Sequence, residues 1–113
     1  MNEHKSGVGT DIKINVHMDP IGGYHMKDVE FIATVYSNTT MKEVVIDKSS
    51  ARAVDDDNYI IIVDTALIGS GRYYLKFCAY VPDADMPSGI RKEVETVDTD
   101  ITITADRRII IGR

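Results

Sequence analysis

The residues best suited to chemistry in this sequence are aspartates that gather in two segments. Asp55, Asp56 and Asp57 follow one another, and Asp83 and Asp85 stand two residues apart. Because Ca²⁺ binds several hard oxygen ligands, often from such loops, Asp55, Asp57, Asp83 and Asp85 are candidate calcium ligands. Neither segment has the spacing of an EF-hand, and aspartates also stabilise tight turns through hydrogen bonds to the backbone. We therefore favour structural turns over a metal site and predict no cofactor.

The other residues that often carry catalysis do not form a known pattern. His4, His17 and His25 lack the spacing of a zinc site, and we expect them to be solvated. Cys78 has no base placed near it by the sequence, so we expect an unreactive thiol. The glycine-rich segment 69–71 leads into a predicted strand, whereas a phosphate-binding loop opens into a helix. The sequence therefore predicts that the chain is not an enzyme.

A second group of residues suits contact with another protein. Tyr74 and Tyr80 fall on the predicted outer face of one strand, and Ile60 and Ile62 fall on that of another. A monomer normally keeps such faces polar, so either a loop or the N-terminal arm covers these side chains, or another subunit contacts them. Tyrosine is enriched in protein interfaces, and Tyr74 and Tyr80 are therefore candidates for an assembly interface.

The end of the sequence combines basic and apolar side chains. Three consecutive isoleucines would favour aggregation at an exposed chain end. We therefore expect them to be buried in the chain's own sheet or added as a strand to a neighbouring subunit. The arginines beside them can limit aggregation or pair with an acidic partner. The candidate assembly residues in this tail are Arg107, Arg108, Ile109, Ile110 and Ile111.

Length and composition bound the architecture that must position these residues. The chain has 113 residues, which suits one domain. Its fifteen Ile, eleven Val and nine Thr far outnumber its two Leu, and β-branched residues favour sheets over helices. The net charge of −5 disfavours binding to nucleic acid or to an anionic membrane. No apolar run approaches the roughly 20 residues that a membrane-spanning helix needs.

Alternating apolar and polar residues predict the strands. Ile12, Ile14 and Val16 alternate with polar neighbours, which is typical of a half-buried strand. Similar segments follow at short intervals with turn residues between them, as in an antiparallel sandwich or a small barrel. We expect a flexible N-terminal arm over residues 1–10, a β domain over residues 11–104, and a C-terminal tail over residues 105–113 that can add as a strand.

The segment from Asp64 to Tyr73 resembles the E–F corner of immunoglobulin-like sandwiches. In that corner a short turn crosses between the sheets, a glycine permits the bend, and a tyrosine two residues later begins the next strand. Gly71 and Tyr73 have this spacing. The chain lacks the disulfide and the tryptophan of antibody domains, so the resemblance concerns the architecture alone. It implies an all-β fold: a single antiparallel immunoglobulin-like β-sandwich of seven to eight strands.

A longer pattern runs from Asp55 to Ile103. Its parts are the acidic turn before Tyr59, Gly69-Ser70-Gly71, the segment 79–85, Gly89-Ile90-Arg91 and Asp98-Thr99. This order resembles small β-sandwich structural proteins of tailed bacteriophages that infect gut Bacteroidales, and in outline the N-terminal domain of phage upper-baseplate proteins. The resemblance implies a non-enzymatic virion protein: a capsid auxiliary protein, a head-fibre base, or a tail or baseplate adaptor.

Such a protein would be assembled in the host bacterial cytoplasm and reside in the virion. Its partners would be capsid, fibre or tail subunits, and it would be oligomeric in the assembly, with no nucleic acid and no membrane as partner. The alternative is a carbohydrate-binding or adhesive β-sandwich module, with Tyr24, Tyr59 or Tyr80 exposed near the acidic loops. The sequence contains no tryptophan, the usual stacking platform for sugars, which favours the virion protein.

Overall fold

The computed structural model describes residues 4–105, and the regular structure of this part is almost entirely β. Its strands are β1 (His4–Gly7), β2 (Asp11–His17), β3 (Glu30–Ser37), β4 (Glu43–Asp47), β5 (Arg52–Asp55), β6 (Asn58–Asp64), β7 (Gly71–Pro82) and β8 (Ile90–Thr104). Short 3-10 turns lie between some of them: η1 (Met26–Asp28), η2 (Lys48–Ser50) and η3 (Thr65–Leu67).

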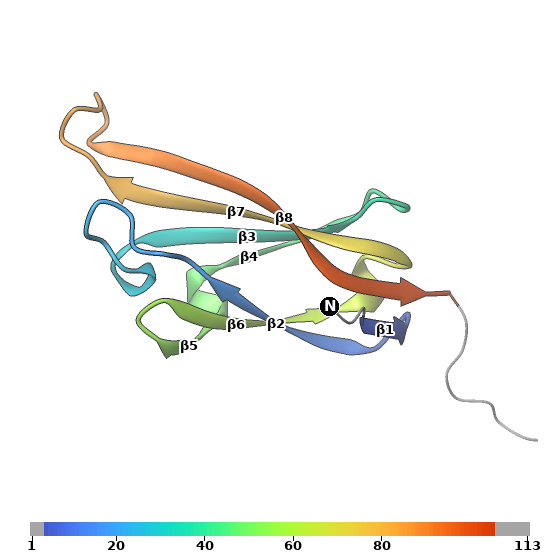
Figure 1. The fold of residues 1–113 in the computed structure, drawn as a ribbon. Helices are drawn as coiled ribbons and strands as arrows, with labels where there is room; N and C mark the ends of the chain where they lie inside the picture. The colour runs from blue at the N-terminus through green and yellow to red at the C-terminus, as the bar shows by residue number, and fades with distance from the viewer. Residues whose placement is uncertain (1–3, 106–113) are drawn as a thin grey trace, which may run out of the picture.

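The strands form two sheets that pack face to face (Figure 1). The larger sheet has the order β1-β8-β7-β3-β4, and the smaller sheet has the order β2-β6-β5. Neighbouring strands are antiparallel except for β1, which runs parallel to β8. The prediction of an all-β fold is therefore confirmed, and the described residues contain no α-helix.

The alternating pattern of the sequence decides which face of each sheet enters the core. In β2, Ile12, Ile14 and Val16 are buried while the polar residues between them are exposed. Phe31 and Tyr59 come from opposite sheets and meet edge to face, with ring centroids 5.1 Å apart. Burial of such a side chain stabilises the fold by about 1.5–3 kcal/mol, so the facing apolar rows hold the two sheets together.

β8 changes character along its length. Ile101 and Ile103 near its end are buried, and this part pairs with β7 on one side and with β1 on the other. The first part, 90–98, pairs with β7 alone among the described residues. A register shift divides the two parts, and Asp100 at this point has a φ of 61°. Such a bulge bends a strand and increases its twist, so the first part of β8 can diverge from the smaller sheet.

The structure tests the predicted boundary at the N-terminal end of the chain but not at the C-terminal end. The sequence predicts a flexible arm over residues 1–10, whereas residues 4–7 form β1. A short polar segment can pair with an open sheet edge through its backbone alone, and it then leaves no alternating pattern in the sequence. The predicted tail lies, apart from Ala105, outside the described residues.

Candidate interaction surfaces

The corner between β6 and β7 is a structural joint rather than a binding site. The Tyr73 hydroxyl donates a hydrogen bond to the carbonyl oxygen of Gly69. Burial raises the pKa of Tyr73 to about 12, so the hydroxyl remains a donor. Gly71 has a φ of +120°, and a Cβ atom at this position would overlap the Oγ atom of Ser37. The local sequence is therefore explained by the bend between the two sheets.

The first aspartate segment forms the turn between β5 and β6, and protein donors occupy its carboxylates. Asp55 accepts hydrogen bonds from the Asp57 backbone N–H and from Asn58 Nδ2, both at 2.9 Å. Asp57 accepts one from the Met26 N–H at 3.1 Å and lies 3.0 Å from His25 Nδ1. Burial acts to raise the pKa of Asp57, but the hydrogen bonds with His25 and Met26 outweigh it and lower that pKa.

The second aspartate segment connects β7 and β8. Asp83 accepts hydrogen bonds from Arg91 Nη1 at 2.6 Å and from the Asp85 backbone N–H at 3.0 Å. The candidate calcium ligands therefore lie in two separate loops, and turn and ion-pair contacts account for Asp55, Asp57 and Asp83. Within residues 4–105 no group of three or more His, Cys, Asp or Glu side chains is placed to hold a metal ion.

His17 takes part in a polar cluster at the end of β2. Its Nε2 atom lies 2.8 Å from Asp19 Oδ1, and its Nδ1 atom lies 3.1 Å from Asn58 Oδ1. The hydrogen bonds with Asp19 and then Asn58 raise the pKa of His17 above its ordinary value of 6.5. About half of the His17 side chain is exposed, so this cluster lies at the surface.

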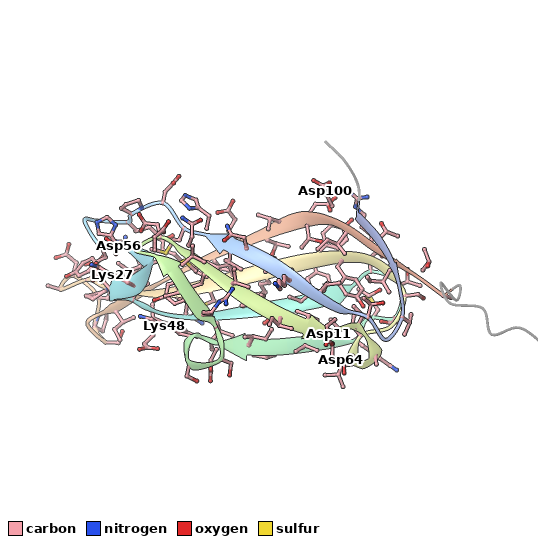
Figure 2. All side chains as sticks on the ribbon, turned by 90° about the horizontal axis from the view of Figure 1, so that it is seen from below. Asp11, Lys27, Lys48, Asp56, Asp64 and Asp100 are labelled. Atoms are coloured by element: carbon pink, nitrogen blue, oxygen red, sulfur yellow. The ribbon has the colours of Figure 1, made fainter. Side chains whose placement is uncertain are left out.

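The contacts around η1 close one end of the molecule. Lys48 donates from Nζ to the carbonyl oxygens of Lys27 and Val29, at 2.7 and 2.8 Å. Lys27 in turn lies 3.4 Å from Asp56, measured from Nζ to Oδ1, and Figure 2 shows both residues at the same end of the sandwich. Polar side chains thus link η1 to η2 and to the turn between β5 and β6 at this end.

Tyr74 and Tyr80, the predicted assembly residues in the sandwich, lie on the outer face of the larger sheet. Tyr74 pairs with Tyr36 across β7 and β3, and their rings stack with centroids 5.7 Å apart. Tyr80 lies opposite Lys92 of β8, and both tyrosines are half-buried. The stacked partner Tyr36 was not singled out from the sequence, because cross-strand pairing depends on a register that only the fold defines.

The smaller sheet also keeps an apolar residue on its outer face. Ile62 is 61% exposed, so no part of the described chain covers it, whereas Ile60 is half-buried.

The aromatic residues suggested for a sugar site also differ in exposure. Tyr59 is buried in the core, so it cannot stack on a ligand, while Tyr24 and Tyr80 reach the surface.

A groove lies between β2, the border strand of the smaller sheet, and the first part of β8, which pairs only with β7 among the described residues. We call it the β2–β8 groove; its volume is about 580 Å³. Its floor consists of apolar residues from both sheets: Ile14, Val16, Met18, Leu75, Phe77 and Ala79. Among the described residues, its rim carries the imidazole of His17 and no Lys or Arg, together with four carboxylates: Asp19, Glu93, Glu95 and Asp98.

Arginines near the rim are shared between several carboxylates. Four ion pairs of 2.6–2.8 Å join Arg91 to Asp83 and Glu93, and Arg72 to Asp98 and Asp100. The hydrogen bond from Arg72 lowers the pKa of Asp98, which keeps this carboxylate charged. Because two arginines serve four carboxylates, and Glu95 adds another, the rim keeps an excess of negative charge.

The sequence carries a signal for this groove that local patterns alone do not reveal. Glu93 and Glu95 of β8 lie opposite Ala79 and Phe77 of β7, so these glutamates share the inward face of the sheet. Carboxylates on an inward face indicate that the facing sheet does not cover that part of the strand. In the sequence, Glu93 and Glu95 alternate with Val94 as the solvent-facing residues of an ordinary strand would. Only the register of β7 and β8 shows that the glutamates lie on the inward face.

The remaining candidate assembly residues lie outside the described residues: Arg107, Arg108, Ile109, Ile110 and Ile111.

Comparisons with family models, with curated proteins and with solved structures find no significant match to this chain. A search of the helical segments between residues 4 and 105 finds none with the length and hydrophobicity of a membrane span.

Proposed function

We propose that the chain is an immunoglobulin-like β-sandwich and a non-enzymatic structural protein of a tailed-bacteriophage virion. It would serve as a capsid auxiliary protein, a head-fibre base, or a tail or baseplate adaptor. Its function would consist of contacts with other virion subunits, including further copies of itself. The sequence pattern from Asp55 to Ile103 supports the assignment to the virion by resemblance.

The distribution of strands supports the immunoglobulin-like assignment. In such domains strands B, E and D share one sheet, and strands G, F and C share the other, which variable-type domains extend with C′. Here β2, β6 and β5 match the first set in chain order, and β8, β7, β3 and β4 match the second. The hydrogen bond from Tyr73 to Gly69 matches the tyrosine corner at the start of strand F.

The observation that carries the functional proposal is the β2–β8 groove. It joins an apolar floor to two strand edges that have no partner among the described residues. Such edges pair readily with another chain, and natural proteins normally cover or shorten them. The exposed Ile62 and the half-buried Tyr74 and Tyr80 add further surface suited to partner subunits.

Quantitative mass spectrometry of purified phage particles tests this proposal. We expect the chain at a copy number that is a multiple set by capsid or tail symmetry, at constant stoichiometry across preparations. Its absence from purified particles, together with abundance in the infected-cell lysate, would contradict a virion role. Binding of the purified chain to a glycan array at micromolar concentration, lost in a Tyr80→Ala variant, would favour the carbohydrate-binding alternative instead.

A further inference from the structure

We propose that the β2–β8 groove binds residues 107–113, within the C-terminal tail, of a second copy of this chain as an added strand. The inference rests on the proposed assembly function and names the partner of the groove. Pairing of an extended segment with an open sheet edge is a common mode of peptide recognition, in which backbone hydrogen bonds give affinity and side-chain pockets give specificity.

The groove has the features that an added strand requires. β2 is the border strand of the smaller sheet, and β8 is free along 90–98 on the side away from β7, among the described residues. In the strand order of immunoglobulin-like domains, strand A pairs with B at the position beside β2. β1 pairs with the end of β8 instead, so no described strand occupies this position.

The floor of the groove offers a place for apolar side chains. Phe77 is half-buried, whereas its neighbours Leu75 and Ala79 on the same face of β7 are buried. Val97 on the rim is 43% exposed. A strand beside these residues would bury its inward side chains against both sheets, and burial of apolar side chains favours association.

The tail matches the groove in charge and in pattern. Ile109 and Ile111 share one face of an extended strand, and Ile110 lies on the other. Two isoleucines can therefore face the apolar floor together. The tail carries three arginines, and the rim carries an excess of carboxylates, so long-range attraction favours the encounter. The arginines of the tail are Arg107, Arg108 and Arg113.

The position of β1 indicates a second copy rather than the same chain. Ile111 follows Thr104 by seven residues and Val97 precedes it by seven, so an extended tail of about 3.3 Å per residue, roughly 23 Å in each case, is long enough to return along β8. A tail that returned along β8 would reach the part that already pairs with β1.

Disulfide trapping between two full-length variants tests the inference. Both carry Cys78→Ser, which removes the single native cysteine; one adds Val97→Cys in the groove, and the other adds Ile111→Cys in the tail. Mixed under oxidised glutathione, they should form a crosslinked pair of the two variants. The matched control replaces Val97→Cys by Val45→Cys on β4, a residue that is 58% exposed and outside the groove.

The control defines the results that overturn the inference. Equal crosslinking of Ile111→Cys to Val45→Cys and to Val97→Cys would show no preference for the groove. A single chain carrying both Val97→Cys and Ile111→Cys should crosslink between chains. A crosslink formed within that chain at high dilution would contradict the second-copy assignment. Circular dichroism of each variant establishes that it is folded.

Substitutions in the tail provide an independent readout. Ile109→Asp with Ile111→Asp should abolish the rise of the weight-average mass with concentration in sedimentation experiments, while Ile110→Asp should weaken it less. Equal losses from both changes would contradict the predicted face of the added strand. If crosslinking and sedimentation show no role of the tail but the chain is present in purified particles, the binding of the tail in the groove is contradicted and the virion role is not. Success with a chain that is absent from particles would overturn the virion role alone.

Discussion

The two parts of β8 form one strand and pair with the same neighbour, yet they differ in their second neighbour and in the burial of their apolar residues. The last part, which contains Ile101 and Ile103, lies between β7 and β1, and both isoleucines are buried. The first part pairs with β7 alone, and Ile90, Val94 and Val97 are between 43% and 50% exposed. The bulge at Asp100 marks the boundary between the two parts.

The difference shows that side-chain type does not by itself decide where this sandwich closes. Both parts contain β-branched apolar residues, and both pair with β7, one on each side of the register shift. The last part is closed because β1 pairs with its second edge and the smaller sheet covers its inward face. The first part carries Glu93 and Glu95 on the corresponding face and borders the groove. An open strand edge beside an apolar floor is where a partner strand would close the fold.

The largest contrast should come from truncating apolar side chains in the two parts of β8. Ile103→Ala removes a fully buried side chain, and we expect the free energy of unfolding to fall by about 2–5 kcal/mol. Val94→Ala removes a side chain that is 50% exposed, and we expect a change within about 0.5 kcal/mol. Urea denaturation of the dilute protein measures both. Similar losses in the two variants would contradict the division of β8.

A smaller contrast should separate two adjacent tyrosines of β7. Tyr73→Phe removes the hydroxyl that donates to the half-buried carbonyl oxygen of Gly69, and the loss of this hydrogen bond costs about 0.5–1.5 kcal/mol. The control, Tyr74→Phe, changes a side chain on the outer face and should leave stability nearly unchanged. Thermal unfolding of both variants gives the comparison. If Tyr74→Phe destabilised as much as Tyr73→Phe, the corner would not anchor the closed end of the sandwich.

The smallest effect concerns Asp98, where the open part of β8 ends. Because its hydrogen bond with Arg72 lowers the folded-state pKa, the charged Asp98 stabilises the fold above its unfolded value of 3.8. This contribution is lost as the pH falls below 3.8 and through the folded-state pKa. The stability difference between the wild type and Asp98→Asn should therefore shrink with acidification in urea unfolding curves. A difference that stays constant below this pH would contradict the ion pair.

The sequence predicts the closed part of the molecule better than its open part. Alternation of Ile12, Ile14 and Val16 identifies β2 because one face of this strand is buried, and the spacing of Gly71 and Tyr73 identifies the corner. β1 was missed because it is short and its sequence has no alternation of apolar and polar residues, although its backbone pairs with β8. The groove was missed because it depends on the register between β7 and β8, a long-range property that local patterns do not contain.

Amide hydrogen exchange along β8 tests most directly whether its open part is an assembly surface. In the dilute protein, exchange should be fast at the edge amides of 90–98 and slow at 101–104, because only the last part pairs on both edges. At concentrations where the chain assembles, we expect new protection along 90–98 and along β2, with 101–104 unchanged. Assembly that adds no protection to these two edges, and instead protects the outer face around Tyr74, would contradict this expectation.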